Sequence, residues 1–172
     1  MTSVRTMFHQ LSVAILLASS ACAVQAQELD GVTGAAKSAI TRYVQGTRIP
    51  CYKMTGETTC LLKETASDAK VFYGTLKNDP APIAVAFIGY QYDATGNAMD
   101  QMAVVFKEVG GRWTAIGRAD NTIGTNPRAL EFGSGEISYT GTVVGPRDNR
   151  ANPRGSARFK LVVSERAVTF VK

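Results

Sequence analysis

The stretch Phe106-Lys-Glu-Val-Gly-Gly-Arg-Trp-Thr114 predicts a β-hairpin, and the hairpin indicates the fold of the whole chain. Its adjacent glycines, Gly110 and Gly111, supply the positive φ angles that a two-residue turn between antiparallel strands requires. Aromatic and β-branched residues on both sides of the turn favour extended strands. We therefore expect paired strands near 101–109 and 112–118.

Similar short runs of β-branched and aromatic residues, separated by Gly, Pro, Asn and Asp, extend from Lys70 to the end of the chain. This pattern is typical of an antiparallel meander and predicts further strands at 70–76, 83–92, 129–133, 136–144, 157–164 and 167–171. One amphipathic helix is expected before them, from an apolar stripe of Val32, Ala35, Ala36, Ala39, Ile40, Tyr43 and Val44. The predicted fold class is α+β or mainly β, with this helix packed on a meander of seven or eight strands.

The first 26 residues have the order of a cleavable signal peptide. Arg5 is their one permanent charge, an apolar run follows from Leu11, and small residues occupy positions 24 and 26. The apolar run is shorter than the roughly 20 residues that a membrane-spanning helix needs. We therefore expect cleavage between Ala26 and Gln27 and an exported bacterial protein, either periplasmic or secreted.

The expected mature chain, residues 27–172, has a length suited to one β-rich domain. No low-complexity tract or repeat divides it. A lipid anchor on Cys22 is the alternative to cleavage at Ala26, although Ser19 stands where a lipoprotein signal has a large aliphatic residue. Cleavage after Ala26 would leave no transmembrane segment in the mature protein.

Cleavage would remove His9, the one histidine of the sequence, and leave 18 Lys and Arg against 14 Asp and Glu, a net charge of +4. A Ser-His-Asp or Cys-His system needs an imidazole to move the proton, so both are excluded for the mature chain. Histidine-ligated metal sites are excluded for the same reason. The sequence therefore predicts no catalytic residue, no metal and no cofactor.

Cys51 and Cys60 would be the two remaining thiols of the mature chain, and an even pair in an oxidising compartment predicts a disulfide. A hairpin turn at Thr55-Gly56 would pair Met54 with Glu57 and place Cys51 directly opposite Cys60. Directly opposite positions on antiparallel strands lie within the range of Cα separations that a disulfide spans. We expect a bridge across this hairpin.

The segment Tyr73-Gly-Thr-Leu-Lys-Asn-Asp79, followed by the apolar strand Ile83-Ala-Val-Ala-Phe-Ile88, resembles a degenerate FG-GAP segment. Residues 73–113 carry this resemblance, which implies a small exported bacterial β-rich domain. In intact FG-GAP segments an acidic loop binds calcium. Here Thr75, Lys77 and Pro80 replace carboxylates or glycine, and only Asn78 and Asp79 still offer oxygens, so no calcium site is expected.

The loop 146–158 has the strongest charge imbalance of the sequence, with one acid among its cations Arg147, Arg150, Arg154 and Arg158. Guanidinium groups bind carboxylates and phosphates through paired hydrogen bonds. The loop therefore predicts contact with an anionic polymer or an acidic exported protein; a solvated loop is the alternative. No aromatic residue is interleaved, so specific nucleic-acid recognition is not expected.

Two other segments are candidate functional sites, one aromatic and one acidic. A ligand-binding face is predicted from Tyr90, Tyr92 and Trp113, with core packing as the alternative. The loop from Asp93 to Asp100 spaces oxygens like the start of a calcium loop but lacks its distal glutamate, so a plain hairpin loop is favoured. The same two carboxylates are the candidates for acid and base in glycan hydrolysis.

These observations favour an exported non-enzymatic binding module that uses the arginine-rich loop. A carboxylate-based hydrolase of cell-wall or other glycans is the first alternative. An inhibitor or accessory subunit of another exported protein is the second.

Overall fold

The computed structural model describes residues 29–51, 56, 58–92 and 99–172. The expected signal peptide, the turn residue Thr55 and the carboxylate of Asp93 lie outside these residues. The described elements are α1 (Lys37–Gly46), β1 (Arg48–Pro50), β2 (Thr59–Leu61), α2 (Leu62–Thr65), β3 (Ala66–Leu76), β4 (Asp79–Gln91), β5 (Met99–Val109), β6 (Arg112–Ala119), β7 (Thr125–Phe132), β8 (Glu136–Val143), β9 (Gly155–Val163) and β10 (Val168–Val171). Neither described helix has the length and apolarity that crossing a bilayer requires.

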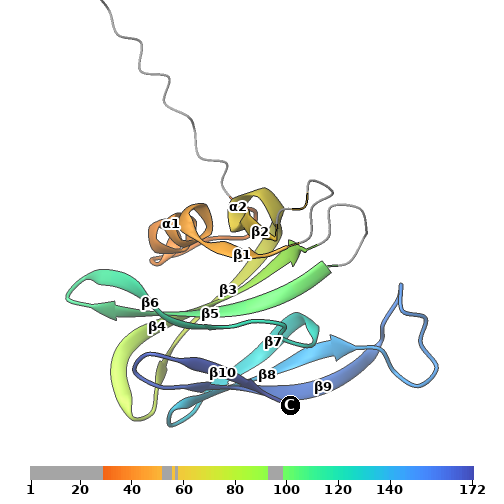
Figure 1. Cartoon of the computed structure of the whole chain (residues 1–172). Coiled ribbons are helices and arrows are strands. Elements are labelled where there is room, and N and C mark those ends of the chain that lie inside the picture. Colours follow the sequence, from red (N-terminus) through yellow and green to blue (C-terminus); the bar gives the residue numbers. More distant parts are fainter. Residues whose placement is uncertain (1–28, 52–55, 57, 93–98) are drawn as a thin grey trace, which may run out of the picture.

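The predicted mainly-β architecture with antiparallel pairing is confirmed. The single meander is wrong, because the eight strands from β3 onward form two four-stranded sheets, β3-β4-β5-β6 and β7-β8-β9-β10 (Figure 1). The chain leaves the first sheet at 120–124, where Asn121 and Gly124 adopt φ values of 54° and 90°. These left-handed conformations turn the backbone away from β6, so β7 starts a new sheet. β1 and β2 form a third, two-stranded sheet.

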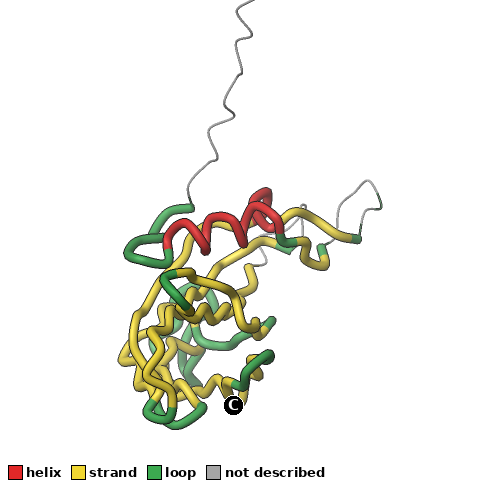
Figure 2. The backbone as a smooth tube through the Cα atoms, turned by 90° about the vertical axis from the view of Figure 1, so that its left-hand side faces the viewer, coloured by secondary structure: helices red, strands yellow, loops and turns green. Residues whose placement is uncertain are grey.

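The first sheet is buried on both faces and forms the middle layer of the molecule. Ile83 to Ile88 of β4 and Met102 to Phe106 of β5 are all buried. Successive side chains of a strand point to opposite faces. Ala84, Ala86 and Ile88 therefore pack with the helical layer, whereas Val85 and Phe87 pack with the second sheet. Figure 2 shows the helices on one side of the strands.

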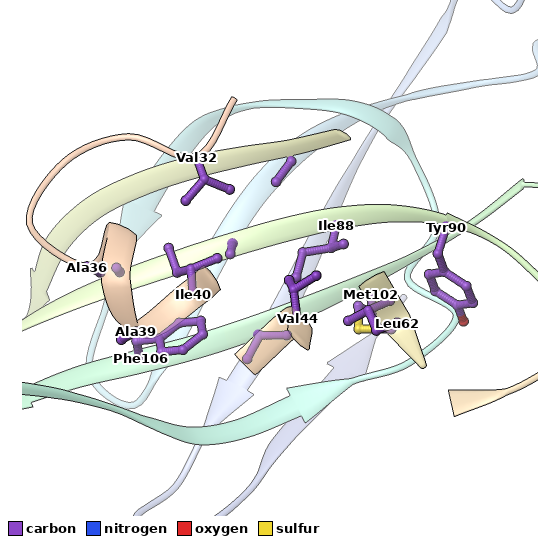
Figure 3. Packing of buried hydrophobic residues seen from close by; sticks show 14 of the residues in the cluster. Val32, Ala36, Ala39, Ile40, Val44, Leu62, Ile88, Tyr90, Met102 and Phe106 are labelled. Carbon is purple, nitrogen blue, oxygen red and sulfur yellow. The ribbon is translucent and has the colours of Figure 1, made fainter. Parts of the chain in front are cut away.

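Helix α1 packs on the middle sheet through small and branched side chains. Ala39, Ile40 and Val44 are buried in one cluster with Phe106 (Figure 3). The helix begins at Lys37 and not near Val32, because Gly34 has a φ of 82°, which no α-helical residue adopts. The apolar stripe thus includes a non-helical start that is buried in the same cluster.

The Tyr73 side chain caps the start of α1 from the sheet. Its hydroxyl accepts a hydrogen bond from Ala36 N at 3.1 Å and donates one to Thr33 O at 2.6 Å. No side chain of the helix itself caps this end. The Tyr73 ring also packs edge-on against Trp113, with centroids 5.9 Å apart. These contacts join α1 to β3 and β6.

The meander topology separates short turns from long connections. Residues 77–78, 110–111, 133–135 and 164–167 connect strands at one end of the sandwich, which we name the hairpin end (left in Figure 1). Gly110 and Gly111 have φ values of 58° and 77°, as the sequence predicts for this turn. Residues 120–124 and 144–154 connect strands at the opposite end, which we name the loop end.

The edges of the two sheets lie next to each other. Gly117 of β6 approaches the backbone of Val168 on β10 so closely that an added Cβ would lie 2.7 Å from Val168 N. On the other side, Lys77 N donates to Gly133 O at 3.0 Å, and the Lys70 ammonium donates to the Asn126 side chain. At these points each edge of the two four-stranded sheets is covered by an edge of the other sheet.

Cys51 and Cys60 lie at disulfide distance, with Cα atoms 5.8 Å apart, as predicted. The predicted register is wrong by two residues, because Ile49 and not Cys51 lies opposite Cys60. A two-residue shift keeps every side chain on its face of the hairpin, so the cysteines still meet. Closing a ring of about ten residues stabilises the fold by about 2.7 kcal/mol on the chain-entropy model.

Candidate functional site

The loop end collects most of the side chains that carry functional potential. β4, β6 and β8 run toward this end, and β5, β7 and β9 start there. The arginine-rich connection 144–154 therefore lies at the same end as Tyr92, Asp100 and Asp120. Rigid strands that present long loops at one end are a common arrangement for binding sites.

Asp148 organises the connection between β8 and β9. Its Oδ2 accepts hydrogen bonds from Gly145 N at 2.8 Å, Arg154 N at 2.6 Å and Gly155 N at 3.0 Å. The two ends of the connection are thereby joined through one carboxylate. The backbone N–H donors, that of Arg154 foremost, lower the pKa of Asp148 because they stabilise its charged form.

Three of the four predicted arginines project from this ordered connection. Arg147, Arg150 and Arg154 are exposed, and their side chains make no hydrogen bond or ion pair with any described residue. The one acid of the connection, Asp148, is bound to backbone N–H groups. The positive charge of the three guanidinium groups is therefore uncompensated by the loop.

Arg158 does not belong with the other three arginines. It lies on β9 and pairs with Glu131 of β7, and Lys160 pairs with Glu136 at 3.0 Å. Alternation along β9 directs both cations to the outer face of the second sheet. The predicted four-arginine contact surface is thus reduced to three, because strand pairing gives Arg158 a carboxylate partner.

Tyr90 and Tyr92 line one cavity, which we name the tyrosine cleft. It has a volume of about 460 Å³ and is also lined by Pro50, Cys51, Asp100, Asp120 and Asn121. Tyr90 is 5% exposed and belongs to the core, whereas Tyr92 is 44% exposed. Burial first, and then the nearby Asp100 and Asp120, raise the pKa of Tyr90 to about 12. The phenol therefore stays neutral and acts as a hydrogen-bond donor.

Trp113 is not part of this site. It lies opposite Glu108 beside the β5–β6 turn, at the hairpin end, whereas Tyr90 lies opposite Asp100. The eight residue steps from Asp100 to Glu108 span about 27 Å of strand at about 3.4 Å per step. The structure therefore does not bring Trp113 together with Tyr90 and Tyr92, and Trp113 packs against Tyr73 instead.

A second cavity of about 480 Å³ opens between the two sheets at the loop end. Asp100 lines it together with Lys70, Gln101 and Asn126. The Gln101 side chain donates to Thr122 Oγ1 at 3.1 Å, and Lys70 donates to Asn126. Most polar groups of this second cavity therefore already have partners, and Asp100 lines both cavities.

The two oxygen donors of the FG-GAP-like segment, Asn78 and Asp79, lie at the hairpin end. Asn78 Oδ1 accepts a hydrogen bond from Gly135 N at 3.0 Å, and Asp79 pairs with Lys107. The Lys107 hydrogen bond lowers the pKa of Asp79. Both oxygen donors thus serve turn structure, and the described residues contain no cluster of acidic, histidine or cysteine side chains suited to a metal ion.

The sequence interpretation missed Asp120 and Asn121. Both line the tyrosine cleft, but they are distant in the chain from Tyr90 and Asp100. Once β5 and β6 are paired, Ala119 lies opposite Ala103, and the next residues must return toward Asp100. Strand register is therefore the signal that places Asp120 beside the cleft.

No protein-family model matches the chain, and no curated protein or solved structure is significantly similar to it. The function of the loop end is therefore inferred from its own geometry and charge. Two features stand out there: the exposed arginines held around Asp148, and the tyrosine cleft.

Proposed function

We propose that the protein is an exported binding module that contacts an anionic partner through Arg147, Arg150 and Arg154. The observation that carries this proposal is the use of Asp148 by three backbone N–H groups. The connection is held in one shape, and its single carboxylate is occupied. Three guanidinium groups on an ordered loop suit a partner with closely spaced carboxylate, phosphate or sulfate groups.

The alternatives from the sequence remain predictions. A carboxylate pair of Asp93 and Asp100 for glycan hydrolysis involves Asp93, which lies outside the described residues. An accessory subunit would use the same arginines if its anionic partner were another exported protein. The proposed contact therefore covers both an anionic polymer and an acidic protein surface.

Replacing Arg147, Arg150 and Arg154 together by glutamine is expected to weaken binding to immobilised heparin. Loss of three ionic contacts makes the negative slope of log K against log salt shallower by about 2 to 3. The matched control replaces Lys77, Arg112 and Arg166, all exposed at the hairpin end, by glutamine. It has the same net charge, so equal elution of the two variants in a salt gradient would contradict the proposal.

Asp148→Ala is expected to accelerate amide hydrogen exchange at Gly145, Arg154 and Gly155 and to weaken heparin retention, although it raises the net charge by one. The Glu165→Gln control raises the charge equally, at the hairpin end. Retention of Asp148→Ala on heparin at or above that of the control would show that the order of the loop is irrelevant to heparin binding.

Because the folded pKa of Asp148 is lowered from 3.8, the loop stays ordered above that pH and loosens only as pH falls through the lowered value.

A further inference from the structure

Asp100 is the carboxylate of the tyrosine cleft without an ionic partner. It forms no ion pair with any described residue, whereas Asp120 accepts a hydrogen bond from Arg118 Nε at 3.2 Å. Asp79, Glu131 and Glu136 are also ion-paired. Asp100 therefore brings an uncompensated negative charge to the wall of a 460 Å³ cavity.

Neutral groups hold the Asp100 carboxylate in place. Its Oδ1 accepts a hydrogen bond from Gln101 N at 2.9 Å, and the Tyr90 hydroxyl interacts with the same carboxylate. Tyr90 is itself fixed, because its ring is packed in the core cluster. The fold thus positions the carboxylate through neutral partners.

The rest of the cleft suits a ligand that is both cationic and apolar. Among the described residues, the charged side chains that act on Tyr90 are Asp100, Asp120 and Arg118, which together carry one net negative charge. The half-exposed Tyr92 ring and Pro50 supply apolar surface in the same cavity. Aromatic rings beside carboxylates bind organic cations through cation–π attraction and charge-assisted hydrogen bonds.

We propose that the tyrosine cleft binds an ammonium group on an apolar chain, with Asp100 as the charged anchor and Tyr92 as the apolar wall. The group is supplied either by a free alkylamine or by a lysine side chain of a protein partner. The cleft is separate from the arginine contact in both residues and sign of charge. Its ligand is therefore expected to bind whether or not Arg147, Arg150 and Arg154 are present.

The test is calorimetric titration of the purified protein with n-butylammonium, Nα-acetyl-lysine methylamide and the neutral analogue n-pentanol. Both ammonium probes are expected to bind at least about tenfold more tightly than n-pentanol, since a hydrogen bond to a charged group is stronger than one between neutral groups. Tighter binding of the lysine probe assigns the ligand to a protein partner, and tighter binding of butylammonium assigns it to a free amine. Binding of all three probes with equal affinity, or of none, would overturn the proposal.

Variants distinguish direct binding of the ammonium group by Asp100 from a general effect of the net charge of the protein. Asp100→Asn, which keeps an acceptor for Gln101 N and Tyr90, is expected to weaken ammonium binding tenfold or more, whereas Glu165→Gln leaves it unchanged. Tyr92→Ala weakens binding several-fold, and Tyr92→Phe retains it because the ring is kept. Unchanged affinity in Asp100→Asn would remove the anchor and with it the proposed site. The triple arginine variant binds the probes normally, so this site and the arginine contact can fail independently.

Discussion

Tyr139→Ala is expected to lower the free energy of unfolding by about 4 kcal/mol, within the range for removing a buried aromatic ring. Tyr139 is fully buried between the two sheets. Its ring packs against Phe87 of the first sheet and Phe159 of the second, with centroids 4.8 and 5.5 Å away. Its hydroxyl donates to Ile123 O at 2.8 Å, in the connection between the sheets. The midpoint of urea unfolding, with an unchanged m-value, measures the loss.

Two controls divide the effect of Tyr139 into its parts. Tyr139→Phe keeps the ring and leaves the Ile123 carbonyl without this donor, so we expect a loss of about 1–2 kcal/mol. Tyr92→Ala removes a half-exposed tyrosine and should cost less than about 1 kcal/mol. If Tyr139→Ala were no more destabilising than Tyr92→Ala, the ring would not be the main link between the sheets. Burial raises the pKa of Tyr139, so the phenol remains a donor throughout the neutral range.

Gly141→Ala is expected to destabilise the protein by about 3 kcal/mol, at the upper end of the usual cost of overpacking. An added Cβ at Gly141 would lie 2.6 Å from Gly124 Cα and 3.0 Å from the Gly124 carbonyl oxygen. Both partners are backbone atoms, so no side-chain rotation relieves the overlap. Gly124 is in turn held by the Phe159 ring, which an added Cβ there would meet at 2.6 Å.

Gly46→Ala is the matched control for this substitution. Gly46 ends α1, and an added Cβ there meets nothing within 4 Å. Replacing such a glycine leaves stability unchanged or raises it by about 0.4–1 kcal/mol, because the unfolded chain loses freedom. Thermal unfolding of both variants checks the comparison. A melting temperature for Gly141→Ala that matches Gly46→Ala would show that β8 and the connection can separate without cost.

The strands were predictable because their signals are local. Aromatic and β-branched residues and the Gly110-Gly111 turn determine β5 and β6 without reference to the rest of the chain. The division into two sheets was not predicted, because it depends on distant packing around Gly124 and Gly141. One local signal did exist, because the six consecutive residues from Ile83 to Ile88 are all apolar, and in the structure all are buried. Such a run is typical of a strand covered on both faces, which a single exposed meander does not contain.

The candidate site was predicted in part, and for a similar reason. A count of charges finds Arg147, Arg150 and Arg154, since composition alone reveals an unbalanced loop. It cannot tell that Arg158 has a partner in Glu131, because that ion pair crosses from β9 to β7. It also treats Asp148 as a compensating charge, whereas three backbone N–H groups occupy its Oδ2 atom.

The meander order of both sheets also bears on how the chain folds. Every strand pair in the two four-stranded sheets joins neighbours in the sequence, so each pairing is local in the chain. Low contact order of this kind favours rapid folding for a β-protein. This order predicts that the two meanders form first and that their docking is the late event. That step requires Gly141 and Gly124 to meet at backbone distance, so these two glycines determine whether the two sheets can join in the correct arrangement.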